Sequence, residues 1–182
     1  MKRQCLKALP ALALLLAIPL GAHEEGFPEA TLKAVFPAAT GFTPRKKTFT
    51  PEQVKQIEQA SRSKLARNDN PLNFYVALGK SPDGSGVLGT VVLIDARGPK
   101  GAIDMALGVR RDGSIERVIV KENGDEKALE EAAFLDQLKG KNAQSPLTLG
   151  KDIRYAGSAP SAEAALSAVR RGLHLLAAAS AK

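Results

Sequence analysis

The fold is decided by residues 87–122, VLGTVVLIDARGPKGAIDMALGVRRDGSIERVIVKE, where apolar stretches alternate with short turns. Three stretches rich in Val, Ile and Leu predict strands: 87–95, 102–110 and 114–122. Asp112-Gly113 is a strong signal for the hairpin turn between the last two. Upstream, LNFYVALG (72–79) predicts one more strand. Successive short strands joined by tight turns indicate antiparallel pairing.

Helices are predicted on both sides of these strands in the sequence. Thr50 can cap a helix that begins at Pro51, and Gln53 completes a capping box. A short helix is expected to end before Pro37. The chain therefore predicts an α+β fold, an antiparallel sheet with helices packed on it.

Two more helices are expected after the strands. The first covers DEKALEEAAFLDQLKGK, with Gly140 placed to end it. The last runs from about Ser161 to Ala179, and four leucine and valine side chains form its apolar stripe: Leu166, Val169, Leu173 and Leu176. The carboxylates near the start of the first of these helices are expected on a solvated face.

The first 22 residues are typical of a secretory signal peptide. MKRQCLK carries three positive charges and precedes an apolar run from Ala8 to Ala22, which is shorter than the roughly 20 residues that span a bilayer. Cleavage after Ala22 predicts an exported, periplasmic protein; an uncleaved leader that acts as an anchor is the alternative. The mature chain then has 23 basic and 19 acidic residues and lacks the single cysteine, Cys5. This modest charge gives no strong membrane-surface signal. The aromatic content of 4% and the absence of Trp argue against single-stranded nucleic-acid binding, and no nucleic-acid partner is expected.

A loop of small residues precedes the last helix. In residues 156–162, AGSAPSA, no long or β-branched side chain blocks access to the helix start. Because the first N–H groups of a helix lack partners and carry partial positive charge, an anion can bind there. Gly157 allows a positive φ, and Ser158 and Ser161 offer hydroxyls. An ordinary helix cap explains the same residues, and the loop matches neither a P-loop nor a dinucleotide fingerprint.

The stretch from about 86 to 177 resembles the FMN-binding domain of exported flavoproteins. These include the periplasmic flavin-carrying subunits of ion-pumping NADH or ferredoxin oxidoreductase complexes. The order of segments carries the resemblance: GPKGAIDMALGV, DGSIERVIV, AAFLDQLKGK and PLTLGKDI, followed by the small-residue loop and the terminal helix. Together with the leader pattern and the helix signals, the resemblance leads us to expect three parts: a signal peptide at 1–22, an N-terminal helical segment at 23–70 and an FMN-binding-like domain at 71–182.

In that family a threonine of the loop takes the FMN phosphate as an ester, attached by a separate transferase. The register places Ala159 at this position, and a methyl group cannot form a phosphoester. The resemblance then implies non-covalent FMN, held by Gly157, Ser158, Ala159, Pro160 and Ser161. The implied role is electron transfer between redox partner proteins of a membrane electron-transport complex, as a carrier rather than a stand-alone enzyme, with no catalytic acid or base. The alternative is a cofactor-less module of the same fold that binds partners in an envelope redox or transport complex.

The histidines and the α-helical arginines are not expected to take part in catalysis or ligand binding, and the role of Tyr155 has two alternatives. His23 and His174 have no neighbouring ligands in the sequence, so no metal site is predicted. Tyr155 either covers a bound flavin or packs at the sheet edge. Arg170 and Arg171 lie about 14 Å along the helix from its start, too far to contact the same phosphate.

Overall fold

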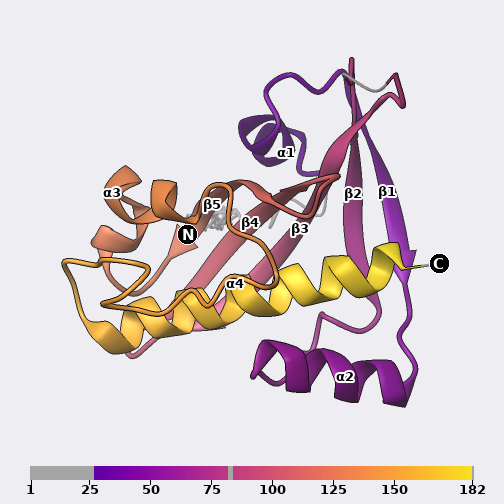
Figure 1. Ribbon diagram of the computed structural model, residues 1–182. Coiled ribbons are helices and arrows are strands. Elements are labelled where there is room, and N and C mark those ends of the chain that lie inside the picture. Colours follow the sequence, from indigo (N-terminus) through magenta and orange to yellow (C-terminus); the bar gives the residue numbers. More distant parts are fainter. Residues whose placement is uncertain (1–26, 82–83, 182) are drawn as a thin grey trace, which may run out of the picture.

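The computed structural model describes residues 27–81 and 84–181. Its centre is a five-stranded antiparallel sheet in the order β1-β2-β3-β4-β5, so that each strand pairs with its neighbours in the sequence (Figure 1). The strands are β1 (Gly41–Lys47), β2 (Leu72–Leu78), β3 (Val87–Arg97), β4 (Ala102–Arg110) and β5 (Ile115–Asn123). The expected α+β class, an antiparallel sheet with helices packed on it, is confirmed.

One face of the sheet is covered by the long helix α4 (Ala159–Ser180), which lies across β3 and β4 (Figure 1). Helix α2 (Pro51–Ser61) packs against α4. Apolar side chains of the sheet and of α4 form the main core, which includes Val92, Ile94, Ile103, Met105, Leu107, Leu166, Val169, Leu173 and Leu176. The stripe predicted for the last helix is therefore the side that α4 presents to this core.

The opposite face carries the short helix α1 (Glu29–Val35), which packs on β4 and β5. Two strand glycines lie beneath it. A Cβ on Gly108 would meet the Val35 side chain, and one on Gly89 would meet the Phe36 ring and the backbone of β4. Only a residue without a side chain allows this approach, so both glycines are required by space.

The predictions that rest on the strongest local sequence patterns are confirmed. Thr50 caps α2 with a full capping box, in which the Gln53 N–H donates to Thr50 Oγ1 (3.3 Å) and the Thr50 N–H donates to Gln53 Oε1 (3.0 Å). Gly113 has φ +83° in the turn between β4 and β5, and Gly140 has φ +78°. α1 ends at Val35, before Pro37, as expected.

Strand β1 was not predicted. Its sequence, GFTPRKK, contains a proline and three consecutive basic residues and lacks the alternation of a half-buried strand. It lies at the edge of the sheet, where proline and basic side chains are tolerated because one side of the strand has no neighbour. The segment 23–70, expected to be helical, thus also contributes a strand to the sheet.

The prediction of a single helix over DEKALEEAAFLDQLKGK is wrong. The chain forms three short pieces instead: η1 (Lys127–Glu130), α3 (Ala132–Leu135) and η2 (Asp136–Leu138). Glu131 is extended (φ −73°, ψ 138°) and separates the first two. Leu129 and Phe134 are both buried, but on one continuous helix they would lie about 140° apart around the axis. The break lets both side chains reach the core.

The predicted signal peptide at 1–22, Cys5 and His23 lie outside the described residues. Within the described residues, no helix is long and apolar enough to cross a membrane.

Candidate functional site

The small-residue loop leads directly into α4, which begins at Ala159, two residues earlier than expected. Ser158 is the N-cap and has extended backbone angles (φ −69°, ψ 126°), but its hydroxyl makes no capping hydrogen bond. The N–H groups of Ser161 and Ala162 both donate to the Ser158 carbonyl (3.1 and 3.2 Å). Pro160 has no N–H. Few backbone donors are therefore left for an external ligand.

A carboxylate of the chain itself lies at this helix start. Glu126 Oε2 accepts the Ser158 N–H (2.8 Å) and the Tyr155 hydroxyl (3.1 Å), and Oε1 pairs with Lys100 Nζ (3.0 Å). The Glu126 side chain is only 14% exposed. The Ser158 amide, Lys100 and Tyr155 hold the pKa of Glu126 below its usual value despite its burial. The Tyr155 and Ser158 donors come from the stretch before α4 and the Lys100 ammonium from the turn between β3 and β4, and all three converge on one anion.

Asp125 lies beside this anion and is held by the turn between β3 and β4. Its Oδ2 accepts the Lys100 N–H (2.8 Å). Burial alone would raise the pKa of Asp125, but the Ser161 hydroxyl and the amides of Lys100 and Gly101 outweigh it, and the pKa lies below its usual value. Ser161 Oγ is fully buried, and neither it nor Asp125 Oδ1 has a partner at hydrogen-bonding geometry among the described residues. The hydroxyl is therefore close to the charge but not aligned with it.

Gly157 is needed for space rather than for its φ angle. It is not among the glycines with positive φ, contrary to the use expected for it. A Cβ there would meet Glu126 Oε2 and the Tyr155 ring, whose Cε1 lies 2.6 Å from the Cβ position. The absence of a side chain at Gly157 is what lets Glu126 and Tyr155 close over the loop.

Tyr155 links the loop to a neighbouring cavity. Its ring packs edge-on against Phe134 (centroids 4.9 Å apart, 62° between planes), while its hydroxyl donates to Glu126. Burial, and then the Glu126 carboxylate, raise the pKa of Tyr155 well above its usual range, so it stays a donor. The cavity beside it has a volume of about 570 Å³, and its lining includes Ala128, Glu131, Phe134, Arg154 and Tyr155.

These residues fit an anion but not covalent flavin attachment. The Ser158 amide, the Tyr155 hydroxyl and the Lys100 ammonium form a donor set that already binds a carboxylate oxygen pair. The same chemistry suits a phosphate oxygen. Ala159 offers no hydroxyl, so no ester can form at that position. In the arrangement described, Glu126 occupies the place that such a phosphate would need.

Comparison with known proteins adds a distant likeness of fold. No known family's sequence profile matches the chain, and no curated protein matches it. Among solved structures, NqrC of Shewanella oneidensis is similar, with 16% sequence identity and a TM-score of 0.42, covering 76% of this chain. The similar region spans 65% of the NqrC chain, slightly less than two thirds. A similarity this distant says nothing about the chemistry of the site.

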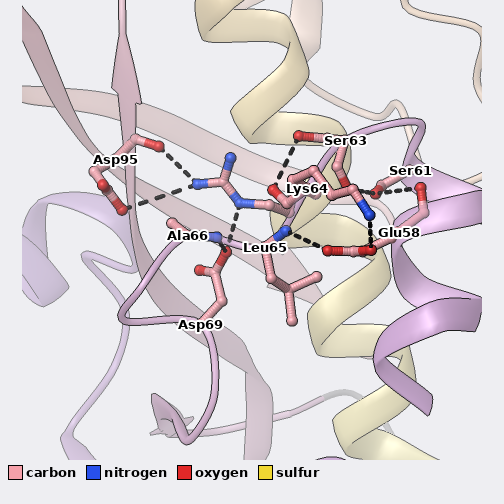
Figure 2. Close-up of polar contacts among 9 residues, drawn as sticks. Glu58, Ser61, Ser63, Lys64, Leu65, Ala66, Asp69 and Asp95 are labelled. Carbon is pink, nitrogen blue, oxygen red and sulfur yellow. Dashed lines mark hydrogen bonds and ion pairs between the residues drawn. The ribbon is translucent and has the colours of Figure 1, made fainter. Parts of the chain in front are cut away.

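The arginines of α4 lie away from the loop, as expected, but one of them is buried. Arg171, 6% exposed, pairs through Nε with Asp69 Oδ2 (2.6 Å) and donates from Nη2 to the Asp95 carbonyl (2.7 Å). Figure 2 shows Asp69 and Asp95 converging there from the loop before β2 and from β3. Arg170 donates to the Leu147 carbonyl (3.2 Å). Both arginines anchor α4 and are not part of the loop site.

His174 is half-buried on α4, and burial lowers its pKa. Within residues 27–81 and 84–181 there is no group of three His, Cys, Asp or Glu side chains that could hold a metal ion. Sequence reasoning missed Glu126 and Lys100 because the carboxylates after β5 were expected on a solvated helix face. The sequence offered one indication of this site, the two adjacent acidic residues in GDEK. The apolar residues that follow them do not all lie on one face of a single helix.

Proposed function

We propose that the chain is an exported protein that binds FMN without a covalent bond and transfers electrons between partner proteins of the cell envelope. The observation that carries this proposal is the convergence of the Ser158 amide, the Tyr155 hydroxyl and the Lys100 ammonium on one anion position at the start of α4. The resemblance of residues 86–177 to FMN-binding domains supports FMN as the ligand. The leader-like pattern of residues 1–22 supports export.

The residues of the chain would act by binding and orientation only. The Ser158 N–H and Lys100 would hold the phosphate. Tyr155, kept protonated, would donate to a phosphate oxygen through its hydroxyl. FMN, when bound, supplies the one- or two-electron chemistry, and the protein sets its position and potential.

A second candidate, a cofactor-less module that binds partners in an envelope redox or transport complex, is favoured by the position of Glu126. A helix start that is already neutralised by the chain's own carboxylate needs no ligand to satisfy it. Asp125 places a second negative charge nearby, which opposes a phosphate dianion. This candidate predicts a colourless protein that co-purifies with a membrane complex.

The two candidates are separated by a titration with two flavins. The full chain, produced with its leader and purified as the cell processes it, is titrated with FMN and with riboflavin while flavin fluorescence is recorded. Recognition of the phosphate predicts that FMN binds more tightly than riboflavin, because charge-assisted hydrogen bonds to the phosphate stabilise only the FMN complex. No binding of either flavin would remove the FMN proposal. N-terminal sequencing of the same protein tests cleavage after Ala22.

A further inference from the structure

We propose that Glu126 is an internal competitor for the anion position, so that an external phosphate ester binds only when the Glu126 side chain has moved out. This inference rests on the proposed function, because it concerns the regulation of the same site. It differs from ordinary helix capping in one respect. A cap only stabilises the helix start, whereas a competitor also lowers the affinity of the site for its ligand.

The contacts of Glu126 use the donors that a phosphate would use. Both of its carboxylate oxygens are engaged, Oε2 by the Ser158 N–H and the Tyr155 hydroxyl and Oε1 by Lys100 Nζ. The Ser158 amide is the donor at the N-cap of α4, where anions are bound most favourably. An added phosphate oxygen and the Glu126 carboxylate cannot occupy this position together.

Two side chains outside α4 make the site more than a capped helix end. The Tyr155 hydroxyl donates to Glu126 Oε2 (3.1 Å). Lys100 reaches Glu126 from the turn between β3 and β4, and its side chain remains 61% exposed. The site therefore has two side-chain donors besides the helix amide, and one of them stays accessible from solvent.

We expect a rotation of the Glu126 side chain to free the anion position. The residue lies where β5 has ended and η1 begins, and its backbone is extended (φ −108°, ψ 128°). Its carboxylate is held by side chains and one amide rather than by packing within a helix. Since the carboxylate belongs to the same chain, its effective concentration at the position is high, and an external anion binds in competition with it.

The size of the effect follows from the fraction of molecules in which the position is free. If charge-assisted contacts keep Glu126 in place in about 90% of molecules or more, the apparent dissociation constant is raised about tenfold or more. Removing the Glu126 carboxylate should lower the apparent dissociation constant by the same factor.

The experiment compares the full chain with Glu126→Ala, Glu126→Gln and Asp136→Asn. Asp136 is exposed on η2, so its replacement removes one negative charge from the same region without touching the site. FMN affinity is measured by fluorescence titration, inorganic phosphate is added as a competitor, and melting temperatures are recorded without ligand. We expect Glu126→Ala to bind FMN at least about tenfold more tightly than the unaltered chain, with phosphate competing, and Asp136→Asn to change the affinity less than twofold.

Each other outcome overturns a different statement. If the unaltered chain and Glu126→Ala bind FMN equally well, Glu126 does not compete, and the proposed function stands without the inference. If neither binds FMN while Glu126→Ala melts at a lower temperature, Glu126 is a permanent cap, and both the inference and the FMN proposal are wrong. Should Glu126→Ala fail to fold, Glu126→Gln answers the same question, because it keeps the size of the side chain and removes its charge.

Discussion

Replacement of Arg171 by methionine is expected to destabilise the protein strongly. Arg171 and Asp69 are 6% and 2% exposed, and their side chains meet at 2.6 Å. Methionine keeps much of the apolar stem but leaves Asp69 with the Ala66 N–H (2.6 Å) as its remaining donor. Removing one member of a buried ion pair typically costs 3–5 kcal/mol, because the other charge stays buried without compensation. We expect a loss in that range near neutral pH.

The loss should depend on pH in a definite direction. Burial raises the pKa of Asp69, and the Arg171 guanidinium opposes that rise. In Arg171→Met the opposing charge is absent, so the pKa of Asp69 in the folded state rises further. A carboxyl whose pKa is higher in the folded than in the unfolded state stabilises the fold below its unfolded pKa, about 3.9, and this contribution is lost as pH rises through the folded pKa. The deficit of the variant should therefore be largest at neutral pH and shrink toward about pH 4.

The assay is urea denaturation followed by far-UV circular dichroism at pH 7.5 and pH 5, applied to Arg171→Met, Asp69→Asn and the double variant. We expect the double variant to lose less than the sum of the single losses by about 2 kcal/mol, since the pair is in direct contact. Arg170→Met is the matched control, because the Arg170 side chain is 25% exposed and its ion pair with the 49% exposed Glu163 is longer, at 3.5 Å. A loss below about 1 kcal/mol for Arg171→Met, or additive single losses, would refute the reasoning.

Gly89→Ala should lower the free energy of unfolding by about 1–3 kcal/mol, because the added Cβ would meet the β4 backbone and would lie 2.6 Å from Phe36 Cζ. Calorimetry tests this prediction, and an unchanged melting temperature would contradict it. Thr50→Ala should cost about 1 kcal/mol through loss of the capping box, and Thr50→Ser, measured by the same denaturation, should recover most of it. Ala159→Thr restores the hydroxyl that the family resemblance requires, so co-expression with a flavin transferase should add FMN covalently. Mass spectrometry reads the result, and a folded variant without added mass would count against an intact FMN site.

The elements that the sequence predicted well are those specified by neighbouring residues. The capping box of Thr50 spans four residues, the turn at Gly113 is set by a dipeptide, and the stripe of α4 repeats within a single helix. Each of these signals is complete before any distant part of the chain is placed.

The elements that were missed depend on distant partners. β1 becomes a strand because it pairs with β2, as in the alignment of Arg45 with Phe74, and nothing in GFTPRKK indicates that pairing. The break at Glu131 depends on a core that receives both Leu129 and Phe134. A periodicity argument assumes that apolar residues share one face, and here they enter the core from two short pieces.

The same distinction applies to the candidate site. The loop before α4 was found because its small residues are contiguous, but its principal contact, between Glu126 and Ser158, joins residues 32 positions apart. Gly157 was expected to provide backbone freedom, but it is needed because a side chain there would meet Glu126 and Tyr155. Long-range contacts of this kind leave no local pattern in the sequence, so only the structure identifies Glu126 as the group at the anion position.

Two independent features of the site bear on how long a flavin could stay. Under the proposed function, Ala159 has no hydroxyl through which FMN could be attached, and the Glu126 carboxylate is held by the Ser158 N–H, a donor that the phosphate would use. Both act in one direction, because each favours release. Under the proposed function, bound FMN would be exchangeable, and dialysis against buffer containing phosphate should strip it. Retention through such dialysis would mean that contacts away from α4, such as the cavity beside Tyr155 and Phe134, dominate the binding, and that the anion position contributes little.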